Sequence, residues 1–353
     1  MTRAALRAPV LRALATAVLA AAPSGVHPQA ATPRTAVVFS GPAMGSRYTV
    51  RVVMPPGDEA ASERVRTAVA GELARVDRLF SGWSPTSELS RLNAHASTEP
   101  FPVSAETVAA LELARHVSEL TGGAFDVTVA PLVEAWGFGP TKGPREVPSG
   151  RVLSALRARV GYRQLSLDAA RRTVAKARPE VACDVSALAG GWAADRIAAA
   201  VVGLGHPDVV VDVGGEVVAR GRRPDRGRWR VAIESPDRNR ERSLVIELED
   251  AAAATSGDYR QAWTDAQGRR RSHILDPRTG EPIAHGLASA TVVDRDGARA
   301  DALATALLVL GPDEGRSLAA RQGLAARLVL RREDGTCVDW LTPSFEALLP
   351  PAR

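Results

Sequence analysis

Apolar residues recur along much of this chain at the spacing of an α-helix. Between residues 57 and 80 they are spaced by four, four, three and four, which places them on one helical face: Val65, Val69, Leu73, Val76 and Phe80. A second helix is predicted over 104–123, with Ser104 as its N-cap and Gly122 as its end. Two further helical patterns run through 190–205 and 298–311.

Runs of β-branched residues outside these helices predict strands. The runs cover 35–41, 46–54, 163–168, 173–185, 207–221, 229–235, 243–257 and 288–294, and the third and fourth form a hairpin region. The order of elements lacks the strict strand–helix alternation of a doubly wound sheet. The sequence therefore predicts an α+β fold in which mixed or antiparallel sheets are flanked by helices.

The composition narrows the class of protein. The chain has 353 residues, of which 45% are hydrophobic, so it can form a large core in one domain or in two closely joined ones. Its net charge is +5, but the arginines are scattered and the densest basic stretch, 268–273, is short. A basic surface for nucleic acid is therefore not expected.

The N-terminal segment is typical of a secretory signal peptide. Arg3, Arg7 and Arg12 precede a short alanine-rich apolar stretch that ends in small residues. The stretch is too short to span a membrane, and no cysteine follows it to carry a lipid anchor. We expect a cleaved signal peptide and linker over 1–31 and a single exported domain over 32–350. The alternative is a disordered alanine-rich tail.

Cys183 and Cys337 are the two cysteines of the chain. An exported protein can join such a pair in a disulfide. Both residues also lie in apolar runs that are typical of small buried side chains. The sequence leaves a disulfide and two buried thiols as alternatives, and two cysteines do not make a metal-binding framework.

The sharpest local signal for chemistry lies in the helical pattern 298–311. Asp301 and Thr305 are four residues apart and therefore share one face of an otherwise apolar helix. A carboxylate and a hydroxyl on a buried face are hard oxygen ligands, which suit Mg²⁺. The alternative is an N-cap aspartate and a threonine that is hydrogen-bonded to its own helix backbone.

His273 is predicted to lie on a short strand just before a turn. Asp276-Pro277 begins that turn, and Gly280 can adopt a positive φ within it. A histidine in this position can act as a general base because its pKa lies near neutrality. The alternative is a surface histidine on an edge strand.

Three loops combine glycine with aromatic or acidic residues: 81–93, 119–140 and 183–195. Glycines beside Trp136 and Phe138 either let the backbone approach a flat ligand or form a packing turn. In 183–195, an acidic residue and a glycine pair at the start of a helical pattern are typical of a turn that meets a phosphate. The chain has no Walker loop, dinucleotide fingerprint, Gly-x-Ser-x-Gly elbow or His-Glu-x-x-His zinc motif.

Taken in order, these segments resemble the ApbE family of FAD:protein FMN transferases. The matching stretches are MGSRYTV, SGWSPTSELSRLN, TGGAFDVTVAPLVEAWGFG, DVSALAGGWAADRI, VDVGGEV, ATSGDYR, HILDPRTG and ADALATALLVLG, which extend over residues 36–332. Each stretch is a weak signal alone, and the shared order makes the resemblance strong. It implies an α+β fold and an exported enzyme that uses FAD and Mg²⁺, releases AMP and leaves FMN on a Thr or Ser of a target protein through a phosphoester bond.

The resemblance also implies roles for particular residues. Asp301 and Thr305 match the metal ligands of the family, and the backbone carbonyl of Ala187 is expected to complete the metal site. His273 matches the base that takes the proton of the acceptor hydroxyl. The positions that match FAD contacts are Met44, Trp83, Ala124, Phe125, Asp126, Asp184 and Leu275. Many members have a tyrosine at the position of Trp83, and tryptophan keeps a stacking surface there.

The implied partner is an acceptor protein, either a subunit of a respiratory redox pump or another extracytoplasmic FMN-binding domain. This agrees with the predicted signal peptide and implies the periplasm or the outer face of the inner membrane. One position departs from the family, which usually has Ala-Lys-Gly where this chain has Ala189-Gly190-Gly191. Loss of one charge-assisted contact weakens binding about tenfold to a hundredfold, unless an arginine from elsewhere replaces it.

Two other functions stay open on the sequence alone. A Mg²⁺-dependent FAD hydrolase would need the same metal and FAD residues, with water in place of the acceptor hydroxyl. A non-catalytic flavin-binding protein is favoured by the missing lysine at Gly190. It is disfavoured by Asp301, Thr305 and His273, because a protein that only binds flavin has no evident use for them.

Overall fold

The computed structural model of the chain describes residues 34–141, 145–236 and 244–351. Residues 34–353 form one compact unit. The predicted signal peptide and linker over 1–31 lie outside the described residues. None of the helices in the described ranges is both long and apolar enough to cross a membrane.

The main element is a sheet of eight strands in which every neighbouring pair is antiparallel. Across the sheet the strands are β1 (Thr35–Ala43), β2 (Ser46–Met54), β6 (Val209–Val213), β7 (Glu216–Arg220), β10 (Ala251–Gly257), β15 (Leu287–Asp294), β16 (Ala325–Arg331) and β17 (Cys337–Leu341). Helices pack against this sheet, so the predicted α+β class is confirmed. The last two strands were not predicted.

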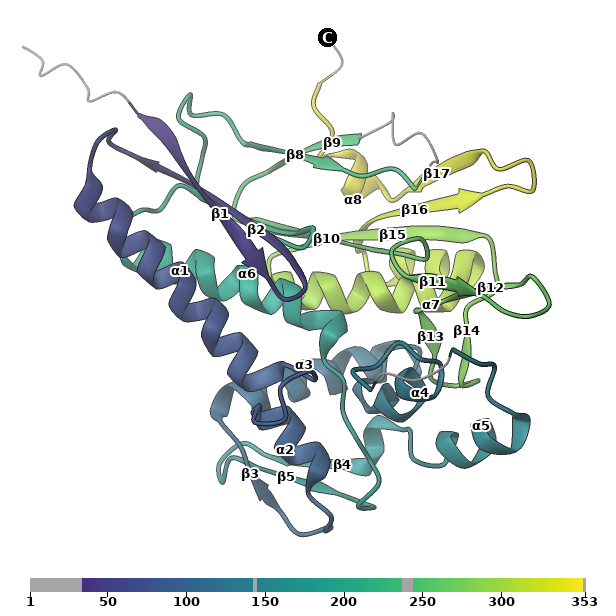
Figure 1. The fold of residues 1–353 in the computed structure, drawn as a ribbon. Coiled ribbons are helices and arrows are strands. Elements are labelled where there is room, and N and C mark those ends of the chain that lie inside the picture. The colour runs from purple at the N-terminus through teal and green to yellow at the C-terminus, as the bar shows by residue number, and fades with distance from the viewer. Residues whose placement is uncertain (1–33, 142–144, 237–243, 352–353) are drawn as a thin grey trace, which may run out of the picture. The chain divides into compact units, whose positions relative to one another are not determined.

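Both faces of the central strands of the sheet are buried, which explains their apolar sequences. Side chains of a strand point alternately to the two faces. Val209 and Val211 of β6 therefore face the large helical core, whereas Val210 between them packs in a second core with Trp229 and Phe345. This second core lies under the hairpin of β8 (Trp229–Ile233) and β9 (Leu244–Leu248) and under α8 (Pro343–Glu346), on the opposite side of the sheet from α6 and α7 (Figure 1).

Besides α8, the described α-helices are α1 (Glu59–Phe80), α2 (Glu88–Ala94), α3 (Ala105–Leu120), α4 (Ala130–Ala135), α5 (Gly150–Arg157), α6 (Ser186–Gly203) and α7 (Gly297–Arg321). The four predicted helices are present as α1, α3, α6 and α7, whereas α2, α4 and α5 were not predicted. The side chain of Ser104 caps α3 as predicted, and Gly122 follows the helix with φ 61°. The helix α6 begins four residues before the predicted start, and α7 continues past a kink at Gly311, where φ is 77° and Pro312 follows.

Smaller sheets surround the core. The strands β3 (Phe101–Pro102), β5 (Thr173–Lys176) and β4 (Leu165–Asp168) form one, while β11 (Ala262–Thr264) pairs with β12 (Arg270–Ser272) and β13 (Leu275–Asp276) with β14 (Glu281–Pro282). Short 3₁₀ helices cover Val127–Val129 and Tyr162–Gln164. The predicted strand over 173–185 is correct only for its first four residues. The rest turns toward α6 and carries Cys183, whose N–H and carbonyl are both hydrogen-bonded by Asn93.

Cys183 is a buried free thiol, so it is not joined to Cys337 in a disulfide. Burial raises the pKa of the Cys183 thiol to about 12, which keeps it protonated and unreactive. Cys337 is only partly buried on the edge strand β17, and the prediction that both cysteines are buried holds for Cys183 alone.

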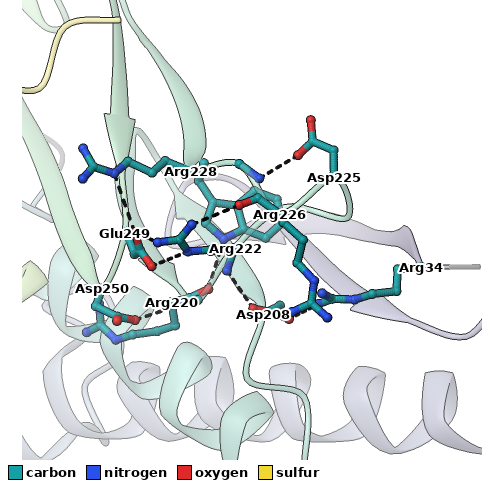
Figure 2. A network of polar contacts seen from close by, with 12 residues as sticks. Arg34, Asp208, Arg220, Arg222, Asp225, Arg226, Arg228, Glu249 and Asp250 are labelled. Atoms are coloured by element: carbon teal, nitrogen blue, oxygen red, sulfur yellow. Dashed lines mark hydrogen bonds and ion pairs between the residues drawn. The ribbon is translucent and has the colours of Figure 1, made fainter. Parts of the chain in front are cut away.

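Many arginines of the surface form local ion pairs. Figure 2 shows a network near the start of β1, in which Arg34 pairs with Asp208 and Arg222 bonds both carboxylate oxygens of Glu249. The second oxygen of Asp208 accepts the backbone N–H of Arg222 at 2.7 Å. These contacts tie together the start of β1, the β6–β7 hairpin and the end of β9.

Candidate functional site

A cavity of about 400 Å³ opens beside the helical face of the main sheet. Its walls come from segments far apart in sequence: the β1–β2 turn, the loop 124–129, the start of α6, the β6–β7 turn, the end of β10, residues 273–277 and the first turns of α7. The cavity therefore exists only because the sheet and the two central helices bring these segments together.

Nearly all of the predicted site residues line this cavity. They are Met44, Ala124, Phe125, Asp126, Asp184, Ala187, His273, Leu275, Asp301 and Thr305. Trp83 does not line it. Its side chain is 70% exposed in the loop between α1 and α2.

The β1–β2 turn brings Met44 to the cavity. Ala43 pairs with Ser46, so Met44 and Gly45 form a two-residue turn in which both have positive φ, 49° and 73°. Such turns match the twist of the strands, and glycine or asparagine usually occupies both positions. A methionine in this conformation carries backbone strain of the kind that concentrates at functional sites.

Asp301 and Thr305 project from α7 into the cavity. The N-cap of α7 is Asp296, which excludes the alternative that Asp301 caps the helix. The Thr305 hydroxyl lies 2.8 Å from the Ser256 hydroxyl of β10, so it is not limited to a bond with its own helix backbone. The backbone N–H of Gly191 donates to Oδ2 of Asp301 at 3.1 Å, which ties this carboxylate to α6.

Close contact between α6 and α7 sets the position of Asp301. A Cβ at Gly191 would lie 2.1 Å from the carbonyl oxygen of Gly297, so only glycine allows the two backbones to approach this closely. Asp195 of α6 accepts hydrogen bonds from the N–H groups of Gly297 and Ala298, at 2.7 and 3.1 Å. These bonds fix the start of α7 and hence the position of Asp301, one turn further along.

Glu216 is a second, partly buried carboxylate at this site, and it was not among the predicted site residues. Burial raises the pKa of both Glu216 and Asp301, and repulsion between the two carboxylates raises that of Glu216 further. Its place beside the cavity follows from the β6–β7 turn, where Gly214 and Gly215 have φ values of 72° and 110°. An acidic residue after a glycine pair in an otherwise apolar strand was the available signal.

The oxygen groups around Asp301 fit a hard divalent cation. A carboxylate with a raised pKa, a hydroxyl and the start of α6 at Ala187 all face one cavity. Within the described chain, no group of three or more acidic, histidine or cysteine side chains could hold a metal ion. Carboxylate, hydroxyl and carbonyl oxygens are the donors that Mg²⁺ prefers, and Mg²⁺ is usually held by one or two carboxylates while it keeps several of its waters.

His273 follows β12 directly and faces the same cavity. Its Nδ1 lies 2.9 Å from the carbonyl oxygen of Gln261. Because a carbonyl can only accept, Nδ1 carries the hydrogen and Nε2 keeps the lone pair. Burial lowers the pKa of His273, and the positive charges of Arg260 and Arg270 lower it further. The imidazole is therefore neutral at pH 7 and can accept a proton at Nε2.

Asp126 and Asp184, the two aspartates predicted to contact FAD, differ in their burial and hydrogen bonds. Both oxygens of Asp126 are bound internally: Oδ1 accepts from the N–H and hydroxyl of Thr128, and Oδ2 accepts from the N–H of Tyr162 at 2.6 Å. Burial raises the pKa of Asp126 despite these bonds. Asp184 is only partly buried and bonds the N–H of Ser186 through Oδ1. Asp126 thus shapes the wall of the cavity, whereas Asp184 faces it at the start of α6.

Trp136 supports the site from outside the cavity. It is buried, donates through Nε1 to the Gly280 carbonyl at 2.9 Å and packs against Trp263 of β11. Of the two alternatives for the glycine–aromatic segment, the packing turn is the correct one for Trp136. This contact holds the β11–β12 hairpin, which leads directly into His273.

Arg260 is a second charged lining residue that was not predicted as part of the site. It follows β10, and its Nη1 donates to the Gly214 carbonyl at 2.7 Å. Arg260 ends the stretch ATSGDYR that resembles the family, but a lone arginine in a polar loop carries no spacing signal of its own.

Comparison with known proteins shows which family this chain resembles. The ApbE family model matches residues 44–328. The FAD:protein FMN transferase of Vibrio cholerae is 39% identical over 319 residues, which cover 90% of this chain and 94% of the relative. The protein of the same name from Klebsiella pneumoniae is 37% identical over 318 residues, covering 89% of this chain and 90% of the relative.

Solved structures agree in fold. The flavin transferase ApbE from Vibrio cholerae superimposes with a TM-score of 0.81 at 38% identity, covering 90% of this chain and all of that chain. The apo flavinyl transferase ApbE of Pseudomonas stutzeri gives a TM-score of 0.82 at 38% identity, with coverage of 90% and 97%. With the family model, the relatives and the fold in agreement, this chain belongs to the ApbE family.

Proposed function

We propose that this protein transfers FMN from FAD to a Thr or Ser hydroxyl of an acceptor protein, with Mg²⁺, and releases AMP. As a member of the ApbE family whose relatives share the name FAD:protein FMN transferase, the protein is a flavin transferase. The observation that carries the finer proposal is one cavity with hard oxygen ligands on α7 and a neutral histidine after β12.

The chemistry is a phosphoryl transfer. The acceptor oxygen forms a bond to the FMN phosphorus of FAD, and the bond from that phosphorus to the oxygen bridging to AMP breaks. The acceptor's proton passes to Nε2 of His273, and AMP leaves with the bridging oxygen and its electron pair. Met44, Ala124, Phe125, Asp184 and Leu275 line the cavity in which the flavin nucleotide would lie.

Asp301, Thr305 and the carbonyl of Ala187 would hold the metal. When bound, Mg²⁺ neutralises the diphosphate and polarises the phosphorus. The chain's own contribution is to hold these donors rigidly through the bond from Gly191 to Asp301 and the contact between Thr305 and Ser256. We also propose that Trp83, exposed in the free protein, covers part of the nucleotide.

The acceptor and the compartment follow from the same proposal. The acceptor is a redox-pump subunit or another extracytoplasmic FMN-binding domain with a flavinylation Thr or Ser. Export by the segment 1–31 would place the enzyme in the periplasm or on the outer face of the inner membrane, with the remaining chain acting as a single domain.

A mass-shift assay tests the function. The protein without its first 31 residues is incubated with FAD, Mg²⁺ and candidate acceptor domains encoded near its gene. We expect one Thr or Ser of an acceptor to gain the mass of FMN, with AMP released in equal amount. FMN and AMP formed without any acceptor would instead identify a hydrolase, and bound FAD that stays intact with Mg²⁺ would identify a flavin-binding protein.

A further inference from the structure

Arg260 brings a permanent positive charge to an otherwise acidic cavity. The acidic side chains around it are Asp126, Asp184, Glu216 and Asp301. Among the lining residues the structure describes, His273 is the other side chain that can become positive, and burial favours its neutral form. A ligand with a diphosphate group therefore meets one permanently cationic side chain here.

The β6–β7 turn forms a seat for the Arg260 guanidinium. The Gly214 carbonyl accepts from Nη1 at 2.7 Å, which uses one of the five N–H donors of the group. A Cβ at Gly215 would lie 2.6 Å from Nη2, so the absence of a side chain lets the guanidinium lie directly against the turn. The positive φ of Gly215 likewise requires glycine.

Arg260 lines the same cavity as His273 and Asp301, which the proposed reaction uses as base and metal ligand. The positive charge of Arg260 lowers the pKa of both groups. In the proposed reaction, the attacked phosphorus must lie between these same groups. A guanidinium can bind phosphate oxygens in pairs through its fork of donors, which suits it to a diphosphate.

The space beside Gly190 is already filled by a carboxylate. A Cβ at Gly190 would lie 2.6 Å from Oε2 of Glu216. Position 190 itself has no side chain, and the group beside it is acidic, so the start of α6 offers the ligand no positive charge here. Any positive charge must come from another segment.

We propose that Arg260 binds the diphosphate of FAD through its guanidinium and thereby supplies the positive charge that the chain lacks at Gly190. This inference rests on the proposed function, because it takes FAD as the substrate. Arg260 acts as a substrate-binding residue, and its seat on Gly214 and Gly215 sets its position.

Substitution of Arg260, with FAD and riboflavin as ligands, distinguishes a contact to phosphate from a purely structural role. For Arg260→Gln, we expect the Kd of FAD without Mg²⁺ to rise about 10- to 100-fold, as loss of a charge-assisted bond does. The Kd of riboflavin, which has no phosphate, stays unchanged. Quenching of flavin fluorescence measures both. Arg171→Gln is the matched control, since it removes one charge from a side chain that is 84% exposed on the β4–β5 turn.

Two outcomes would overturn the inference: an FAD affinity of Arg260→Gln equal to that of Arg171→Gln, or an equal loss for riboflavin and FAD. The affinity measurement does not depend on transfer. If the wild-type protein binds FAD but modifies no acceptor, the proposed function fails while the role of Arg260 is still decided by the two ligands.

A lysine at position 190 tests whether positive charges at positions 190 and 260 bind the same diphosphate group. We expect Gly190→Lys to restore FAD affinity to Arg260→Gln by about tenfold, because the new ammonium displaces the carboxylate end of Glu216, pairs with it and reaches the same diphosphate. Gly203→Lys, at the open end of α6, is the control with the same added charge. Equal affinities for the two double variants, with equal melting temperatures, would refute the shared role.

Discussion

Asp301→Asn is expected to abolish FMN transfer while leaving the protein folded. The substitution keeps the shape of the side chain and removes the one carboxylate that α7 presents to the proposed metal. A metal ion contributes several kcal/mol of charge stabilisation in phosphoryl transfer, so we expect kcat to fall about 10³-fold or more. The rate of acceptor flavinylation at saturating FAD and Mg²⁺ measures this loss.

Thermal melting separates the loss of the metal from the loss of the fold. A ligand that binds only the folded state raises its melting temperature, so Mg²⁺ should stabilise the wild type and not the variant. Burial raises the pKa of Asp301 from 3.8 to about 7, so its ionisation costs stability as the pH rises between these values, and the full cost is present at pH 8. Asparagine avoids this cost, so the metal-free variant should not melt lower at pH 8. Asp313→Asn, at an exposed position on the same helix, should behave as wild type throughout.

Persistent Mg²⁺ stabilisation of Asp301→Asn, together with transfer at the wild-type rate, would show that the metal binds elsewhere. Loss of transfer in both Asp301→Asn and Asp313→Asn would point instead to a general effect of charge on α7.

His273→Gln is expected to lower kcat by about 10²- to 10⁴-fold, the usual contribution of a positioned base. Glutamine can keep the hydrogen bond to the Gln261 carbonyl but cannot accept the acceptor's proton as imidazole does. The KM for FAD should change little, because the lost interaction forms only as the acceptor reacts. His116→Gln, on the exposed surface of α3, is the control.

The dependence of the transfer rate on pH provides a second test of the role of His273. Transfer needs the neutral imidazole, so activity rises with pH through the pKa of His273 and is level above it. Burial lowers this pKa from its ordinary value near 6.5, and the wild type should therefore stay active below that pH. The rising limb should vanish in His273→Gln. A limb that persists unchanged in the variant would assign the titrating group to another residue.

The sequence by itself determined much of the secondary structure, because the relevant signals are local. The spacing of apolar residues defined α1, and Ser104 capped α3 as predicted, since both depend on neighbouring positions in the chain. The hydrophobic segments also determined the α+β class. The strand over 173–185 was overestimated, because its end is held by long-range bonds from Asn93 rather than by strand pairing.

The candidate site was predictable wherever two chemical groups share one element. The spacing of Asp301 and Thr305 on a single helix was visible in the sequence, and the resemblance to a family favours the metal-ligand interpretation of this pair. Trp136 shows the opposite case. The same glycine–aromatic pattern fits a ligand contact or a packing turn, and only its burial against Trp263 decided between them.

Only the tertiary structure decided how charge is arranged around the cavity. Glu216, Gly190 and Arg260 lie on three separate segments, and they meet because α6 packs on α7 beside the β6–β7 turn. Electrostatic interaction depends on distance in space and on burial, neither of which the order of residues contains. The sequence thus determined which groups the chain has to offer, and the packing of α6, α7 and the sheet decided which of them face one ligand.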